Sequence, residues 1–262
     1  MESDILTTKQ IIVALANKYE GDWAVIYKVI SKREDLDTLS DWCDKSKDTD
    51  QITLLDPEYP KTLKGGYQPP FVLFYKGDIS LLADSNTKLC VSAGREIDPL
   101  LLNKALEDIS QLPKDIVIVT QVSDIIHTAI KTGHKVIVTL PCGYNMYWSV
   151  CNAETRKLVL QNGGLVITTY PDYHAPDPTS MIIKTQLQSG LSNAILIVDA
   201  KPKSSTNTVV TFALQQPGNT SIMAYPTLPG ENKINNSLIK QGATLVENVE
   251  DILLELGKGE QL

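Results

Sequence analysis

The chain has 262 residues, of which 42% are hydrophobic, and a formal net charge of −7. This length accommodates one large α/β domain with a small appendage, and the hydrophobic content is sufficient for a packed core. The acidic balance argues against a strongly basic nucleic-acid-binding protein, although affinity for phosphate depends on the local patch rather than on the net charge.

Apolar residues recur at helical spacing in residues 1–48, which predicts a small helical module without strands. Its three apolar stripes are Ile11, Ile12, Leu15 and Ala16, then Val25, Ile26, Val29 and Ile30, and then Leu36, Leu39 and Trp42. Nothing in this module is chemically distinctive, so we expect it to pack or dock against the rest of the chain.

A lead-in segment, residues 49–87, follows the helical module. Four prolines and the adjacent Gly65 and Gly66 interrupt it, and residues 71–75 are predicted to form a strand. We expect this segment to run extended and to wrap onto the domain that follows.

Regular alternation of strands and helices begins at Lys88 and defines the main domain, residues 88–262. The predicted strands cover residues 89–92, 116–119, 136–138, 165–168, 194–198, 221–225 and 244–246. The predicted helices cover residues 98–109, 122–130, 150–161, 234–239 and 249–256, with a further helix near residue 208 and a Pro-rich loop over residues 169–178. Short buried strands separated by helices specify an α/β fold with a mostly parallel sheet covered on both faces.

Residues 184–213 contain a buried strand, a polar turn and a helix start, the unit that often faces a ligand in an open α/β sheet. Lys184, Lys201 and Lys203 flank it against one acid, Asp199, so the local charge is opposite in sign to that of the chain. Anions bind readily at such helix N-termini. A purely structural turn is an equally good interpretation of this stretch alone, because any α/β protein needs one after a buried strand.

Several polar residues follow the predicted strands. The carboxyl ends of parallel strands meet at one edge of a sheet, so these residues are expected to line one crevice. The crevice is predicted to contain Arg95, Thr120, Ser123, Gly143 and residues 201–208, which include Ser204, Ser205 and Thr206.

The motifs of common nucleotide-binding and hydrolytic sites are missing from the sequence. It has no GxGxxG after the first strand of the main domain, no GxxxxGK[ST] loop and no GxSxG elbow. His127, His134 and His174 have no Cys or Ser partner that the sequence supports. We therefore expect an anion-binding site without a cofactor.

The cysteines and the N-terminus indicate the compartment. Cys43, Cys90, Cys142 and Cys151 form no CxxC pair, and we expect reduced structural thiols with neither a zinc site nor disulfides. The first ten residues are polar and acidic, and no run of eighteen apolar residues occurs. We expect neither a signal peptide nor a membrane-spanning helix, and a cytoplasmic location.

Three stretches of the sequence resemble the DNA-processing protein A family (DprA, also called Smf), and the resemblance extends over residues 52–256. They are YPKTLKGGYQPPFVLFYKGDISLL at 59–82, SGLSNAILIVDA at 189–200 and NSLIKQGATLVENVEDIL at 236–253. The resemblance implies an extended Rossmann-like fold, preceded by a helical module of the SAM-like or helix-hairpin-helix-like kind. It also implies a cytoplasmic homodimer that is not an enzyme, binds single-stranded DNA and helps to load a RecA-type recombinase during recombination of incoming DNA.

The site motifs of this sequence depart from those of the family. The family's Gly-Ser-Arg corresponds to residues 93–95, which keep the arginine, but its Arg-Asn-Arg corresponds to residues 184–186, where Lys184 and Gln186 replace both arginines. This change removes one charge and both bidentate guanidinium groups. Gln121 and Ser205 stand where the family has turn glycines. The resemblance therefore implies the family fold with a weakened DNA site.

Together, the crevice and the resemblance predict one set of DNA-binding or phosphate-binding residues. The set is Arg95, Thr120, Ser123, Gly143, Asn152, Lys184, Gln186, Lys201, Lys203, Ser204, Ser205, Thr206 and Thr211. Two other functions stay open from the sequence. One is the binding of a nucleotide or another small phosphate ligand in the same crevice, and the other is a scaffold that kept the fold and lost the ligand.

Overall fold

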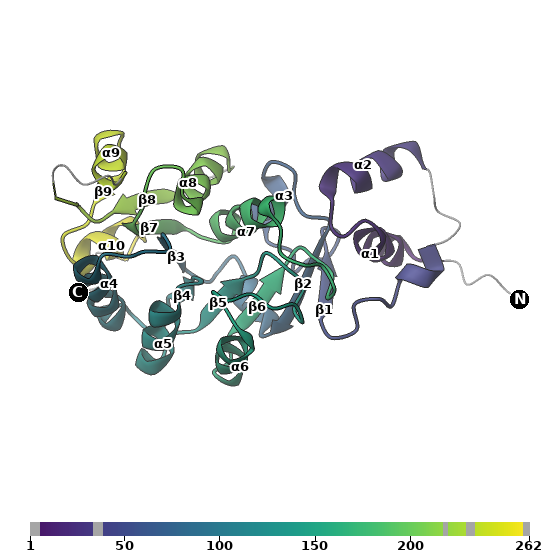
Figure 1. The fold of residues 1–262 in the computed structure, drawn as a ribbon, viewed down its shortest axis with the longest axis horizontal. Helices are drawn as coiled ribbons and strands as arrows, with labels where there is room; N and C mark the ends of the chain where they lie inside the picture. Colours follow the sequence, from purple (N-terminus) through teal and green to yellow (C-terminus); the bar gives the residue numbers. More distant parts are fainter. Residues whose placement is uncertain (1–5, 34–38, 217–219, 229–233, 259–262) are drawn as a thin grey trace, which may run out of the picture.

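A computed structural model describes residues 6–33, 39–216, 220–228 and 234–258. A nine-stranded sheet runs through the molecule in the order β1-β2-β6-β5-β4-β3-β7-β8-β9 (Figure 1). The strands are β1 (Asp50–Thr53), β2 (Val72–Gly77), β3 (Lys88–Ala93), β4 (Val117–Val119), β5 (Val136–Thr139), β6 (Leu165–Thr168), β7 (Ala194–Asp199), β8 (Ser221–Ala224) and β9 (Thr244–Leu245). The seven strands from β3 to β9 are parallel, which confirms the predicted fold class.

Helices cover both faces of this sheet. One face packs against α4 (Pro99–Gln111), α5 (Ser123–Thr132), α6 (Ala153–Gln161) and α10 (Val249–Glu255). The other packs against α3 (Lys61–Gly65), the 3₁₀-helix η2 (Ile79–Leu82), α7 (Pro178–Gly190), α8 (Ser205–Gln215) and α9 (Asn235–Lys240). Leu89 and Val91 of β3 enter the first core and Cys90 the second, as expected where successive side chains alternate between faces. All four cysteines are free thiols.

The lead-in segment contributes two strands to the sheet, one more than predicted. Strand β2 pairs antiparallel with β6, and β1 pairs antiparallel with β2. Strand β1 follows a polar stretch and shows no alternating pattern of apolar residues, so the sequence does not predict it. Its extended conformation is stabilised by pairing with β2.

The N-terminal helices lie at the β1 end of the sheet (Figure 1). They are α1 (Thr8–Lys18), α2 (Trp23–Lys32) and the 3₁₀-helix η1 (Leu39–Trp42). Leu15, Ile26 and Leu39 of the predicted stripes pack with Val72 and Phe74 of β2 in a third core. Leu36, from the same stripes, lies outside the described residues.

Helix α7 was not predicted from the sequence, and its presence is a correction to the expected order of elements. It begins at Asp177, which caps it through the backbone N–H groups of Thr179 and Ser180, and Pro178 occupies its first turn. Its buried face is largely polar and includes Ser180, Lys184, Gln186 and Gln188. Apolar periodicity is therefore absent from a helix that nevertheless lies across the sheet beside α8.

No helix in the described part of the chain has both the length and the apolar run needed to cross a bilayer.

Candidate nucleic-acid interface

A cleft of about 710 Å³ lies where β3, β4 and β7 end. Its lining includes seven of the predicted site residues. They are Arg95, Ser123, Lys184, Lys201, Lys203, Ser204 and Ser205. These residues come from the loops after three parallel strands and from α7, so the order of strands in the sheet brings them together.

Two helix N-termini open into this cleft without a side-chain cap. The cap residue of α5 is Val122 and that of α8 is Ser204, and neither side chain accepts a hydrogen bond from its helix. By contrast, Asp98, Asn152 and Asp177 cap α4, α6 and α7 with their side chains. The first N–H groups of α5 and α8 therefore remain available to an anion, and both helix dipoles favour negative charge there.

The charged side chains of the cleft are mainly cationic. Four cations, Arg95 and the three lysines, line it together with two carboxylates, those of Glu96 and Asp124. Lys201 Nζ lies 2.5 Å from Glu96 Oε2, and this contact lowers the pKa of the exposed Glu96 carboxyl.

Lys203 holds a left-handed backbone conformation with φ of 61°. Because this conformation disfavours residues with a Cβ, Lys203 marks a strained loop at the cleft.

Lys184 occupies the buried inner wall of the cleft. Only 3% of the residue is exposed, and its Nζ donates to Gln121 Oε1. The ammonium also lies 5.3 Å from the centre of the Trp148 ring. Burial, with a smaller contribution from the positive charge of Arg95, lowers the pKa of Lys184 to about 7.

Six predicted site residues do not line the cleft. Thr120 is fully buried and donates to the carbonyl oxygen of Val91, and Asn152 caps α6. Gly143 packs so closely on residues 171–172 that a Cβ would lie 2.2 Å from the Pro171 carbonyl oxygen. Thr206 is fully buried, and Thr211 donates to the Asn207 carbonyl oxygen inside α8.

Gln186 is the sixth of these residues. Its Nε2 donates to the carbonyl oxygens of Tyr67 and Gln68. It lines a second cavity, of about 450 Å³, between α7 and the N-terminal helices. Lys184 and Gln186 therefore serve different cavities on two sides of α7.

The cleft is also lined by side chains outside the predicted set of site residues, among them Glu96, Gln121, Trp148 and Met181. Glu96 and Gln121 follow β3 and β4 directly, so the rule that selected Arg95 and Ser123 also applies to them. Trp148 and Met181 come from a long loop and from the unpredicted α7. They add apolar surface to the lining beside Lys184, and no local sequence pattern signals that role.

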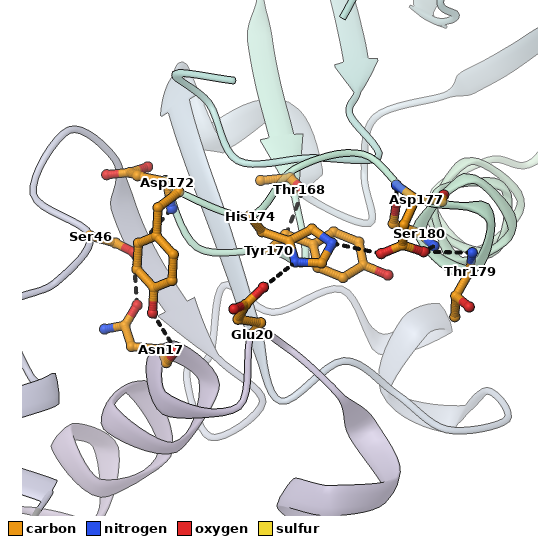
Figure 2. A network of polar contacts seen from close by, with 11 residues as sticks. Asn17, Glu20, Ser46, Thr168, Tyr170, Asp172, His174, Asp177, Thr179 and Ser180 are labelled. Atoms are coloured by element: carbon orange, nitrogen blue, oxygen red, sulfur yellow. Dashed lines mark hydrogen bonds and ion pairs between the residues drawn. The ribbon is translucent and has the colours of Figure 1, made fainter. Parts of the chain in front are cut away.

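A polar network joins the N-terminal helices to residues 169–177, which connect β6 to α7 (Figure 2). His174 stacks on Tyr170 with a centroid distance of 4.2 Å, and its ring nitrogens face Glu20 Oε2 at 2.8 Å and Asp177 Oδ2 at 3.1 Å. The buried Asp172 accepts from the Asp48 N–H and from the Thr49 hydroxyl, each at 2.9 Å. The segment that leads into α7 is therefore held by the N-terminal part of the chain.

Comparison with known proteins extends this description. DNA processing protein DprA of Streptococcus pneumoniae is 25% identical over 209 residues, which is 78% of this chain and 73% of that protein. Protein Smf of Synechocystis is 23% identical over 249 residues, covering 89% of this chain and 61% of that protein.

Solved structures share the fold. The crystal structure of S. pneumoniae DprA aligns with a TM-score of 0.74 and 22% identity over 95% of this chain and 93% of that one. DNA processing protein A of Helicobacter pylori, solved to describe its single-stranded DNA binding mode, aligns with a TM-score of 0.66 and 22% identity over 82% of this chain and 98% of that one. The model of the family called DNA recombination-mediator protein A matches residues 50–257. The chain therefore belongs to the DNA recombination-mediator protein A family, as its resemblance to DprA and Smf implied.

Proposed function

We propose that this protein binds single-stranded DNA in the cleft at the carboxyl edge of its sheet and acts in recombination without catalysing a reaction. The observation that carries the proposal is the joint placement of Arg95, Lys184 and Lys203 with the two uncapped N-termini of α5 and α8. Family membership supports it, as does the single-stranded DNA binding described for the H. pylori protein.

The two kinds of lining suit the two parts of a DNA strand. Cations and helix N-termini bind phosphate, and they supply most of the affinity when DNA is bound without regard to sequence. Trp148, Val150 and Met181 add apolar surface against which a base can pack. A single strand exposes both its phosphates and its base faces, so it matches this cleft better than a duplex does.

The site is proposed to be weaker than one built on arginines. Lys184 offers a point charge in place of a planar guanidinium, and Gln186 turns away from the cleft toward Tyr67. The carboxylate of Glu96 also forms an ion pair with Lys201. Fewer phosphate contacts give lower affinity and a shallower dependence on salt.

The family resemblance extends the proposal to partners and location. We infer a cytoplasmic homodimer that helps a RecA-type recombinase to assemble on bound DNA. Faster assembly of recombinase filaments on coated single-stranded DNA in the presence of the protein supports this role. An unchanged assembly rate at saturating protein contradicts it.

Fluorescence anisotropy with labelled oligo-dT tests the DNA-binding proposal. The wild type is expected to bind at low salt, and Arg95→Ala to bind about tenfold more weakly, the loss that corresponds to about 1.4 kcal/mol. Lys131→Ala is the matched control, because Lys131 is an exposed cation at the opposite end of α5 from the cleft. No binding by the wild type, or equal losses in both variants, contradicts the proposal.

A nucleotide or another small phosphate ligand is the second candidate. The cleft volume of about 710 Å³ falls in the range of small-molecule sites, roughly 300–1,000 Å³. A thermal-shift series with nucleoside mono-, di- and triphosphates distinguishes the two. A large rise in melting temperature with one nucleotide and none with oligo-dT favours the small ligand, and the reverse result favours DNA.

A further inference from the structure

Lys184 differs from the other cations of the cleft in being almost completely buried. No ion pair with an acid is found for Lys184 within the described ranges, and its one hydrogen-bond partner there is the neutral Gln121 amide. A neutral amine can also donate a hydrogen bond to Gln121 Oε1, although a weaker one than an ammonium donates. Either protonation state of Lys184 is therefore compatible with this contact.

The groups around Lys184 do not fix its charge. Trp148 favours the cation through its ring face, and Arg95 disfavours it. Cys90, which lies beside it from β3, has its pKa raised by burial to about 12, so the thiol is neutral near pH 7. The remaining charged groups of the cleft are Glu96, Asp124, Lys201 and Lys203, and Glu96 is paired with Lys201.

From this geometry we propose that Lys184 is a proton-linked phosphate contact, so that a phosphate group entering the cleft binds together with one proton taken up from solvent. The inference rests on the proposed function and specifies how that site is regulated. A phosphate oxygen supplies a negative partner for the buried ammonium, whose hydrogen-bond partner in the described structure is the neutral Gln121 amide. Bound DNA therefore stabilises the charged form of Lys184, and affinity depends on pH through that proton.

The sign of the effect follows from the pKa. Burial lowers the pKa of Lys184 to about 7 in the free protein, and a bound phosphate raises it again. The complex then holds more protons than the free protein above pH 7, so affinity falls as pH rises. Affinity for oligo-dT is expected to be about fivefold weaker at pH 8 than at pH 7, and about fiftyfold weaker at pH 9, if the pKa in the complex lies above about 10.

Isothermal titration of the full chain with oligo-dT, at constant low salt and in buffers of different ionisation enthalpy, measures both affinity and proton uptake. Uptake of about one proton by the wild type at pH 8 is expected. Lys184→Arg keeps its charge at every pH and should lose the pH dependence. Lys184→Met fits the same space without charge, and it should bind more weakly at pH 6.5 and change little up to pH 9.

Each outcome decides the inference. Binding by the wild type with equal affinity from pH 6.5 to 9 leaves the proposed function intact and overturns the proton linkage. A pH dependence that persists in Lys184→Met assigns the proton to another group and also overturns it. No binding at any pH contradicts the proposed function itself, and the inference falls with it. Nitrogen-15 NMR follows the titration of the lysine side chains, and the spectrum of Lys184→Met assigns the signal of Lys184. When DNA is added, the pKa of Lys184 must rise and those of the other lysines must stay unchanged.

Discussion

At the scale of single residues, Glu96 opposes the charge of the cleft. It is 81% exposed at the side chain and pairs with Lys201, so one of the four cations already has a negative partner. An exposed ion pair of this kind contributes little to stability. Its main effect is to compete with phosphate for Lys201.

Glu96→Gln is therefore expected to strengthen DNA binding about three- to tenfold at low salt and to leave the melting temperature within about 1 °C of the wild type. The substitution releases Lys201 and removes a carboxylate that repels phosphate. Glu107→Gln, on the exposed part of α4, removes the same charge away from the cleft and controls for net charge. Anisotropy and thermal unfolding measure the two effects. Weaker binding by Glu96→Gln would show that Glu96 orders Lys201 for the ligand.

At the scale of elements, α8 begins beside a strained residue. The left-handed conformation of Lys203, with φ of 61°, costs about 1 kcal/mol for a residue with a Cβ. Lys203→Gly relieves this strain and removes the charge, whereas Lys203→Ala removes the charge and keeps the strain. The two variants should bind oligo-dT equally weakly, but the glycine variant should be more stable by up to about 1 kcal/mol in urea unfolding. Equal stabilities would contradict the strain assigned to this loop.

Apolar periodicity could not predict the part of the site that α7 contributes. The signal for its start, Asp177 followed by Pro178, is the same as the one that predicted α4 at Asp98 and Pro99. Because the buried face of α7 is polar, the rest of the helix shows no apolar periodicity in the sequence. Without the helix, Lys184 and Gln186 were both expected in one crevice, although residues two positions apart on a helix point to nearly opposite sides.

The parallel strands were easier to predict than the site, because buried apolar runs between turns specify them directly. Strand order then carried Arg95, Ser123 and Ser204 to one cleft. The direction of a side chain depends on the local backbone conformation and on packing. The rule that the carboxyl ends of parallel strands meet at one edge says nothing about either. Thr120 follows β4 as expected and still turns into the sheet to bond the Val91 carbonyl oxygen.

At the scale of the whole molecule, residues 169–177 link the N-terminal helices to the start of α7 (Figure 2). Asp172 is 6% exposed and accepts two hydrogen bonds from residues 48 and 49, while Tyr173 donates to the Asn17 carbonyl oxygen. The same segment ends at the cap of α7, the helix that carries Lys184.

Asp172→Ala should lower the free energy of unfolding by about 2–4 kcal/mol, because it leaves the Asp48 N–H and the Thr49 hydroxyl without their acceptor. Amide exchange in α1 and in the first turn of α7 should also accelerate. Asp44→Ala, at an exposed position of the same N-terminal part, is the matched control and should change stability by less than about 0.5 kcal/mol. Faster exchange confined to residues 46–49 would show that the network does not connect the two parts.

The salt dependence of oligo-dT binding tests the central claim most directly, because it counts the phosphate contacts made in the cleft. The logarithm of the binding constant should fall linearly with the logarithm of salt concentration for the wild type. Arg95→Ala should reduce the slope by about one, and Lys131→Ala should leave it unchanged. A wild-type slope near zero, or the same slope for Arg95→Ala and the wild type, would contradict DNA binding through this cleft.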